Sequence, residues 1–166
     1  MEESRTYSKG DWIVHSQFGI GKIKGVDIKD ISGEKTEYFR IKTSSSTFWM
    51  PVNQMDSELL RPLSTPDEIE QAIVTLQKPA KEMSSNYKMR QNRIQIARAR
   101  NTPKAIAKLI RDLRARQRDK GILNSSERSA FRSFKQRLVE EWVIVSGKKT
   151  EKIESTLDAL LNPIQK

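Results

Sequence analysis

The chain has 166 residues, of which 36% are hydrophobic and 31% are charged, enough for one ordinary domain or two small ones. It has no cysteine and a single histidine, His15, which excludes disulfides and zinc sites built from thiolate and imidazole ligands. The net charge is +10, no apolar run approaches the ~18 residues of a membrane span, and the polar first residues lack a secretory signal, so we expect a soluble cytoplasmic protein.

The first sixty residues have the pattern of short β-strands. β-rich runs occur at 11–14, 20–31, 36–43 and 47–52, and they are separated by turn-forming glycine and serine residues. Within 36–43 the side chains alternate with the period of two that a half-buried strand shows. Four or five such strands predict a small, strongly bent antiparallel sheet or barrel, whose bending the glycines between 19 and 25 would permit.

From residue 65 onward the pattern is helical. Thr65, Pro66 and Glu68 form a capping box with proline at the first helical position. Four further helices are expected. The first covers roughly 86–99 and is capped by Ser84 or Ser85, and the second starts at Thr102-Pro103 and ends at Gly121. The third is capped by Asn124 with Glu127 and ends near Gly147, and the last, a short one, is capped by Thr150 and ended by Asn162-Pro163. The short loops between them predict a compact all-α bundle of about five helices. The predicted fold class is α+β with two domains, 1–64 and 65–166.

The charge is unevenly distributed between these halves. Residues 1–65 carry nine Lys/Arg and nine Asp/Glu, whereas residues 78–137 carry 18 basic and four acidic groups. Clustered Lys and Arg attract phosphate and release condensed counterions on binding, which favours a nucleic-acid partner for the helical half. The alternative is a solvated charged surface of the kind that many helical proteins have.

The sequence offers little for catalysis. His15 lies in a strand, where a structural or exposed role is expected, and the Glu140-Glu141 pair reads as ordinary surface or capping charge. No Walker, Rossmann or EF-hand spacing occurs. We therefore expect no enzyme, no catalytic residue, no metal site and no cofactor.

The basic helices carry the remaining signal. Tyr87 is expected at a helix N-terminus, where it could pack against a neighbour or project toward DNA with Lys88 and Arg90 close by. From the residues alone these two interpretations are equally good. The helix over 103–120 adds seven basic residues outside its apolar stripe, some of which could form only a solvated face: Lys104, Lys108, Arg111, Arg114, Arg116, Arg118 and Lys120.

Several short blocks resemble the CarD/CdnL family of RNA polymerase-binding regulators. In the β-rich half these are Gly10-Asp11-Trp12-Ile13-Val14, Phe18-Gly19-Ile20-Gly21-Lys22-Ile23, Gly33 to Tyr38, and Met50-Pro51-Val52. In the helical half they are Ala105 to Leu113 and Gly121 to Glu127. The resemblance covers roughly residues 8–161, and the order and spacing of the blocks are more specific than any one of them.

The resemblance implies a Tudor-like or SH3-like β-barrel in the N-terminal half that docks on the RNA polymerase β subunit by pairing strand edges. Carried over by position, the docking residues are Ile28, Lys29, Ile31 and Trp49. Trp49 lies between Phe48 and Met50, so both faces of that strand are apolar. Burial on both faces would explain this pattern without a partner, and an exposed patch would explain it with one.

The resemblance also implies that an aromatic wedge enters the minor groove at the upstream edge of the promoter −10 element and stabilises the open complex. The family's usual residue is tryptophan, and the matching position here is Tyr87, which should stack more weakly. Met89 stands where many relatives have a basic residue, and His15 and Phe18 also depart from the pattern. With the charge pattern, the candidate DNA contacts are Tyr87, Lys88, Arg90, Arg93, Lys108 and Arg114.

The predicted function is thus a non-enzymatic, monomeric transcription regulator of the nucleoid, bound to polymerase and to double-stranded promoter DNA with low sequence specificity. One alternative is a ribosome-associated or RNA-binding protein, because small β-barrels with basic helices occur there too. A magnesium-dependent nuclease is a second alternative, which the scarcity of carboxylates in 78–137 disfavours.

Overall fold

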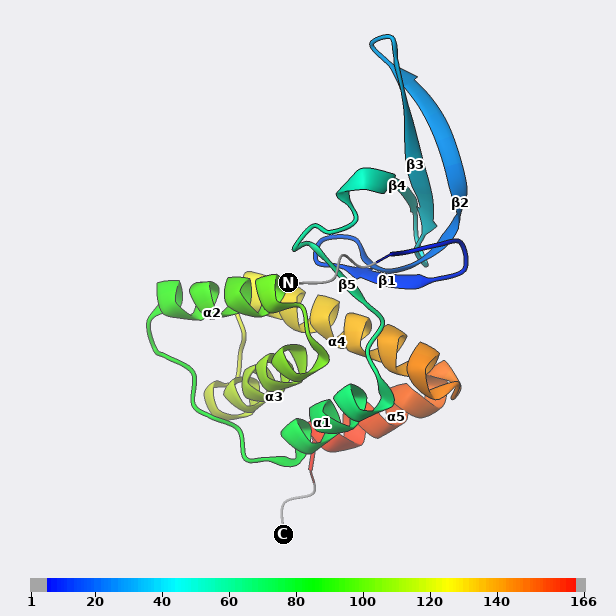
Figure 1. The fold of residues 1–166 in the computed structure, drawn as a ribbon. Helices are drawn as coiled ribbons and strands as arrows, with labels where there is room; N and C mark the ends of the chain where they lie inside the picture. Colours follow the sequence, from blue (N-terminus) through cyan, green and yellow to red (C-terminus); the bar gives the residue numbers. More distant parts are fainter. Residues whose placement is uncertain (1–5, 164–166) are drawn as a thin grey trace, which may run out of the picture. The chain divides into compact units, whose positions relative to one another are not determined.

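The structure of the protein, a computed structural model, describes residues 6–163 (Figure 1). The chain forms two compact units that divide in sequence between Leu63 and Ser64. The first unit consists of strands and the second of helices, so the predicted α+β class is confirmed. None of the helices in the described range is long and apolar enough to cross a membrane.

Five strands form one antiparallel sheet in the order β4-β3-β2-β1-β5. They are β1 (Trp12–His15), β2 (Gly19–Ile31), β3 (Glu34–Lys42), β4 (Thr47–Pro51) and β5 (Leu60–Pro62), with a short 3-10 helix at Val52–Gln54. The strands at the two ends of this order, β4 and β5, do not pair with each other, so the sheet is open. The prediction of a small barrel therefore describes this sheet only loosely.

The long β2–β3 hairpin extends past its neighbouring strands (Figure 1). Its turn is Ser32-Gly33, and both residues have positive φ, as tight two-residue hairpin turns require. The strand β1 pairs only with the first part of β2, from Gly19 to Lys22. The outer edge of β2 from Lys24 to Ile31 consequently has no strand beside it among the described residues.

The core of the N-terminal unit lies on one face of this sheet. Its buried hydrophobic residues are Ile13, Ile23, Phe39, Ile41, Phe48, Met55 and Leu60. A Cβ at Gly21 would lie 2.6 Å from Ile41 Cγ2 and 3.2 Å from the Lys42 carbonyl oxygen, so the β2 backbone can approach β3 this closely only with glycine there. The irregularity that shifts the β2–β3 register lies just beyond, between Ile23 and Gly25.

Five helices form the second unit, as the sequence predicts. They are α1 (Pro66–Gln77), α2 (Tyr87–Arg100), α3 (Pro103–Lys120), α4 (Ser125–Ser146) and α5 (Thr150–Leu161). The capping box at Thr65 and Glu68 is present. Two predicted caps were wrong: Asn86, rather than Ser84 or Ser85, caps α2, and Thr150 is already the first residue of α5, which begins after Lys149 without a side-chain cap.

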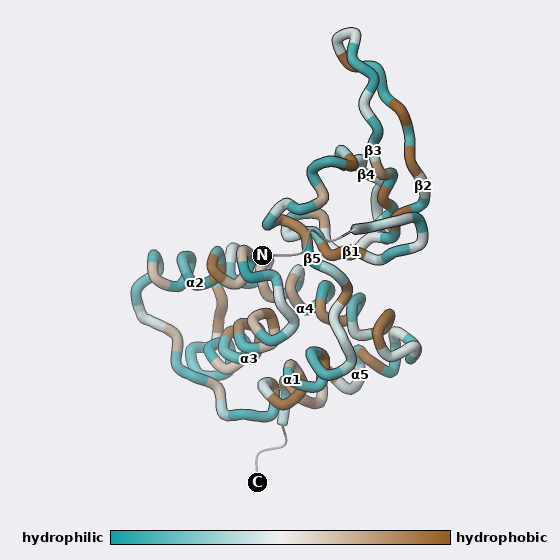
Figure 2. The backbone as a smooth tube through the Cα atoms, viewed as in Figure 1, coloured by the Kyte–Doolittle hydropathy of each residue, from teal (hydrophilic) through white to brown (hydrophobic). Residues whose placement is uncertain are grey.

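The helices bury one continuous apolar cluster. More of its fully buried residues come from α3 than from any other helix. Ile106, Leu109, Ile110 and Leu113 recur at helical spacing on its inner face, and Phe134 and Leu138 of α4 belong to the same cluster. Figure 2 shows hydrophobic positions alternating with hydrophilic ones along the helices. This core fixes the surfaces of α2 and α3 that carry the candidate DNA contacts.

Candidate functional site

Trp49 is fixed on one face of the sheet by its charged neighbours. Its Nε1 donates a hydrogen bond of 2.8 Å to Asp27 Oδ2, and Arg40 donates one of 2.7 Å to Asp27 Oδ1. Lys29 Nζ lies 3.7 Å from the centroid of the indole ring, a cation–π contact. The ring is nevertheless 40% exposed. Of the two explanations that the sequence left open for this strand, the exposure of Trp49 agrees with the exposed patch, and its contacts give the ring one orientation.

The carboxylate of Asp27 organises this arrangement. The hydrogen bond from the Trp49 indole, and then that from Arg40, lower the pKa of Asp27 against the opposing effect of burial. Asp27 is therefore ionised at neutral pH and available to both donors. The sequence analysis missed Asp27, although its position two residues before Lys29 places both on the same face of a strand.

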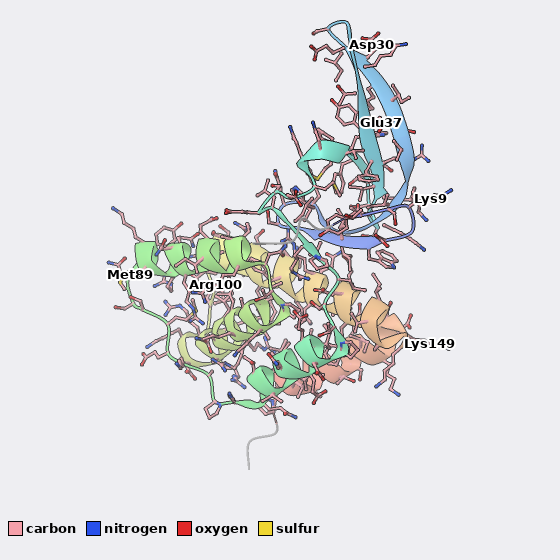
Figure 3. The ribbon with its side chains drawn as sticks, in the orientation of Figure 1. Lys9, Asp30, Glu37, Met89, Arg100 and Lys149 are labelled. Carbon is pink, nitrogen blue, oxygen red and sulfur yellow. The ribbon has the colours of Figure 1, made fainter. Side chains whose placement is uncertain are left out.

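The predicted docking residues lie on both faces of the sheet, three of them on β2 and Trp49 on β4. Lys29 and Ile31 share the face of Asp27 and Trp49, because side chains two residues apart in a strand point the same way. Ile28 points to the opposite face, together with Val26, and 67% of its side chain is exposed. Figure 3 shows the side chains that flank this hairpin, with Asp30 and Glu37 labelled. Ile28, Lys29 and Ile31 thus lie along the unpaired edge of β2, on both of its faces. Trp49 lies on β4, with β3 between it and β2, and only its ring reaches Asp27 and Lys29 of β2.

Tyr87 is the first residue of α2, and 53% of its side chain is exposed. The adjacent residues Lys88 and Met89 are exposed as well (Met89 is labelled in Figure 3). Arg90 Cζ lies 5.9 Å from the centroid of the Tyr87 ring, on the inner side of the helix. Of the two interpretations that the sequence left open for Tyr87, projection into solvent is the one compatible with this exposure.

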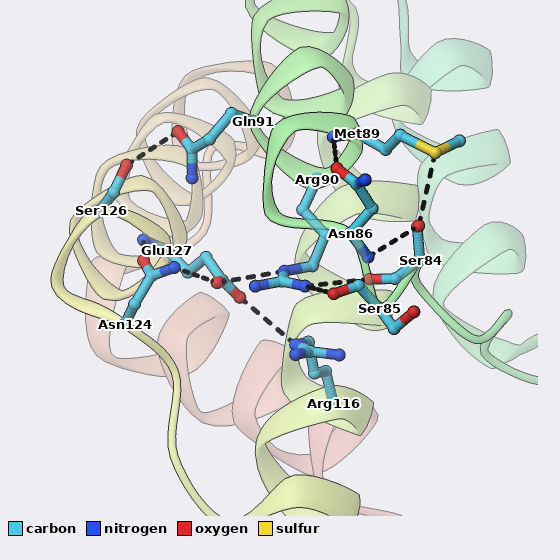
Figure 4. Close-up of polar contacts among 10 residues, drawn as sticks. All are labelled: Ser84, Ser85, Asn86, Met89, Arg90, Gln91, Arg116, Asn124, Ser126 and Glu127. Carbon is cyan, nitrogen blue, oxygen red and sulfur yellow. Dashed lines mark hydrogen bonds and ion pairs between the residues drawn. The ribbon is translucent and has the colours of Figure 1, made fainter.

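Arg90 is directed into the helical unit and is 8% exposed (Figure 4). Its Nε donates to Glu127 Oε1 at 3.3 Å, and its NH1 donates to the carbonyl oxygens of Ser84 at 3.1 Å and Ser85 at 2.9 Å. This guanidinium holds the segment that precedes Tyr87. The Arg90 guanidinium exposes little surface to a phosphate. This geometry suits a positioning role better than the DNA contact that the sequence predicts.

Glu127 connects this segment to α3 and α4 (Figure 4). Its carboxylate is 1% exposed, and Arg116 Nε of α3 lies 3.5 Å from its Oε2. Its backbone N–H donates to the N-cap Asn124 at 2.8 Å, and the Asn124 amide donates back to Glu127 Oε1. The start of α2 and the start of α4 therefore share one buried ionic network.

A second buried carboxylate, Asp112 of α3, gathers basic groups. Arg93 of α2 donates to its Oδ2, while Arg111 Nε at 2.8 Å and the backbone N–H of Lys81 at 3.0 Å donate to its Oδ1. Burial raises the pKa of Asp112, but these hydrogen bonds outweigh it and the pKa is lowered. The structure brings Arg93 and Lys108 together here and adds Lys81, a loop residue that no sequence pattern singled out.

Arg114 lies elsewhere on α3. Its Nε donates to Asn162 Oδ1 at 2.7 Å, beyond the end of α5, and its NH1 donates to Gln117 at 2.6 Å. The DNA contact of Arg114 stays a prediction. Its side chain is half-buried and already holds the C-terminal end of α5 against α3.

Two family models match successive parts of the chain. The CarD-like/TRCF RID domain matches residues 7–64, and the CarD C-terminal domain matches residues 71–158, more than half of the chain. The chain belongs to the CarD family. The resemblance read from the sequence blocks is thereby confirmed, and the two family domains correspond to the strand-rich and helical units.

A curated relative supports membership of the CarD family over nearly the whole length. It is a Bacillus subtilis (strain 168) protein named "Putative transcription factor YdeB", 24% identical to this chain over 152 residues. The match covers 88% of this chain and 96% of the relative. The two proteins are therefore similar in length.

Proposed function

We propose that this CarD-family protein is a non-enzymatic transcription regulator that binds the RNA polymerase β subunit and stabilises the promoter open complex. In this proposal residues 1–64 bind polymerase, and residues 65–166 bind double-stranded DNA at the upstream edge of the −10 element. The observation that carries the proposal is the exposed Tyr87 ring at the start of α2, in the unit that accounts for the whole net positive charge of the chain.

The polymerase interaction is supported by the unpaired edge of β2. Unpaired N–H and C=O groups along Lys24–Ile31 can accept a strand from a partner, and side chains on both faces then provide specificity. Ile28 would contact the partner on one face, and Lys29, Ile31 and the oriented Trp49 ring would contact it on the other.

The DNA interaction is supported by the geometry around Tyr87. An aromatic ring inserted at a base step can hold unstacked bases apart, and a protein that binds the open state preferentially shifts the closed-to-open equilibrium. Lys88 and Arg93 would contact phosphates without reading the sequence. Arg90, through Glu127 and the Ser84 and Ser85 carbonyls, would keep the ring in place.

The polymerase interaction is tested by the binding of purified polymerase, or of a β-subunit fragment, to the full chain. We expect Ile28→Arg and Trp49→Ala each to weaken this binding at least several-fold, because Ile28 is an exposed anchor on the β2 edge and Trp49 is an exposed ring that lies over Lys29 of β2. Leu59→Ala is the matched control, an exposed hydrophobic residue of the same unit outside β2 and β4. Unchanged affinity in both variants, or binding to ribosomal particles instead of polymerase, would contradict the proposal.

A further inference from the structure

The basic groups around Asp112 carry more positive charge than this carboxylate neutralises. The main charges acting on the Lys108 ammonium are those of Lys81, Arg93 and Arg111, opposed by Asp112. Both oxygens of the Asp112 carboxylate already accept hydrogen bonds, and from Lys81 they accept the backbone N–H rather than the ammonium. Four positive charges therefore act near one carboxylate whose oxygens are both engaged. Two further carboxylates, Glu82 and Asp119, line the same pocket as Lys81 and Asp112, but so do the basic Arg116, Arg118 and Lys120.

The surplus charge is accessible to a ligand. Lys81 and Lys108 are exposed and Arg93 is half-buried, and these three residues come from the loop before α2, from α3 and from α2. The charge of Lys81 is the first cause of the lowered pKa of Lys108. The geometry agrees with this: Lys108 lies about one helical turn before Asp112, whose Oδ1 accepts the Lys81 backbone N–H. Like charges held together in the unbound protein repel one another, and a bound anion would relieve that repulsion.

We propose that Lys81, Arg93 and Lys108 form a binding site for one backbone phosphate of duplex DNA. This inference rests on the proposed DNA-binding function and adds to it a specific contact. Arg111 does not bind the phosphate: it is buried, donating to Asp112 and, at 3.0 Å, to the Thr75 carbonyl oxygen. Arg111 and Asp112 instead hold the three accessible cations in place.

The site lies within reach of the duplex that Tyr87 would contact. Arg93 follows Tyr87 by six residues in the same helix, about 9 Å along its axis at 1.5 Å per residue. Successive phosphates of one strand are about 3.4 Å apart along the DNA axis, so this separation corresponds to two or three nucleotides. A phosphate contact at this distance would fix the position of α2 relative to the step at which Tyr87 inserts.

The test compares the salt dependence of duplex binding by the full chain, the double variant Lys81→Ala/Lys108→Ala, and the control Lys149→Ala/Lys152→Ala. The control removes the same charge from exposed positions at the start of α5. Because Lys81, Arg93 and Lys108 share one phosphate and the double variant keeps Arg93, the log–log slope should become shallower in the double variant, by at most about 0.9, and the control should match wild type. In ¹⁵N-lysine NMR of the wild type, saturation with duplex should raise the pKa of the Lys108 ammonium.

Each outcome is decisive. If wild type binds duplex but the double variant has the wild-type slope, or the same slope as the control, the phosphate site is wrong and the proposed function stands. An unchanged Lys108 titration in the saturated complex would also overturn the site. If wild type does not retain duplex even at low salt, both the site and the proposed function fail.

Discussion

The Tyr87 side chain differs from its surroundings in α2 because it is aromatic, half-exposed and located where the helix begins. Base stacking on an aromatic side chain contributes about 1–3 kcal/mol per base. In a tyrosine the ring is smaller than an indole and ends in a hydroxyl, so we expect a value at the low end. The ring can act as a wedge only if its backbone is held, which is the role assigned to Arg90.

We predict that Tyr87→Ala shortens the lifetime of the promoter open complex at least about five-fold, from the loss of ~1 kcal/mol of stacking, and that Tyr87→Trp lengthens it. The lifetime is measured by competitor challenge of preformed complexes, with polymerase affinity measured in parallel. Ile96→Ala, another exposed hydrophobic residue of α2, is the control. Equal lifetimes for the alanine variants at 87 and 96 would show that Tyr87 does not act as a wedge.

Glu127 is the residue on which the start of α2 depends most. Replacing it with alanine leaves the buried Arg90 charge without its carboxylate, and such changes cost about 3–5 kcal/mol. We expect Glu127→Ala to lower the free energy of unfolding of the helical unit by an amount in that range, and Glu127→Gln to lower it less, because an amide oxygen can still accept from Arg90. Chemical denaturation provides the measurement, with the exposed Glu154→Ala as control. If both alanine variants unfold at the same denaturant concentration, the network does not stabilise the unit.

At the scale of elements, α2 and α3 are joined by an ion pair whose strength depends on pH. The pKa of Asp112 in the folded protein lies below its ordinary value, so its contribution to stability is complete above about pH 4 and is lost as the pH falls through the folded-state pKa. We predict that the difference in unfolding free energy between wild type and Asp112→Asn shrinks steadily from pH 5 toward pH 2. A difference that stays constant over this range would mean that the carboxylate is not ionised in the folded protein.

Local patterns predicted most of the elements, because strand alternation, proline at the first helical turn and Thr or Asn caps are properties of adjacent residues. The open sheet was not predictable in the same way, since closure depends on whether β4 and β5 meet, and neither strand carries a signal for that. The alternation in β2 was sufficient to place Ile28 and Lys29 on opposite faces, although the docking residues were treated as one surface.

Burial of basic residues was the part of the candidate site that the sequence could not reveal. Arg90 and Lys88 look equivalent in a list of cations, yet one is buried because Glu127, 37 residues later, supplies a partner. The gathering of Lys81, Arg93 and Lys108 likewise depends on Asp112, which follows Lys81 by 31 residues. Contacts between distant segments decide which charged side chains face solvent, and the residue pattern of one helix does not predict those contacts.

At the scale of the whole molecule, the two units are proposed to have separate tasks. We propose that the unit of zero net charge, with its unpaired strand edge, binds polymerase and that the strongly basic unit binds DNA. Joining them in one chain turns DNA binding into a local event, because the bound polymerase raises the effective concentration of the helical unit near the promoter. Weakening the interaction with polymerase should therefore raise the protein concentration needed to stabilise the open complex. Removing the Tyr87 ring should instead shorten the open-complex lifetime even at saturating protein.

The most direct test of this division is the open-complex lifetime measured over a wide range of protein concentration for wild type, Ile28→Arg and Tyr87→Ala. We predict that Ile28→Arg requires more protein but reaches the wild-type lifetime at saturation, and that Tyr87→Ala stays short-lived at every concentration. If saturating Ile28→Arg never restores the lifetime, or excess Tyr87→Ala does, the two units do not divide the work as proposed.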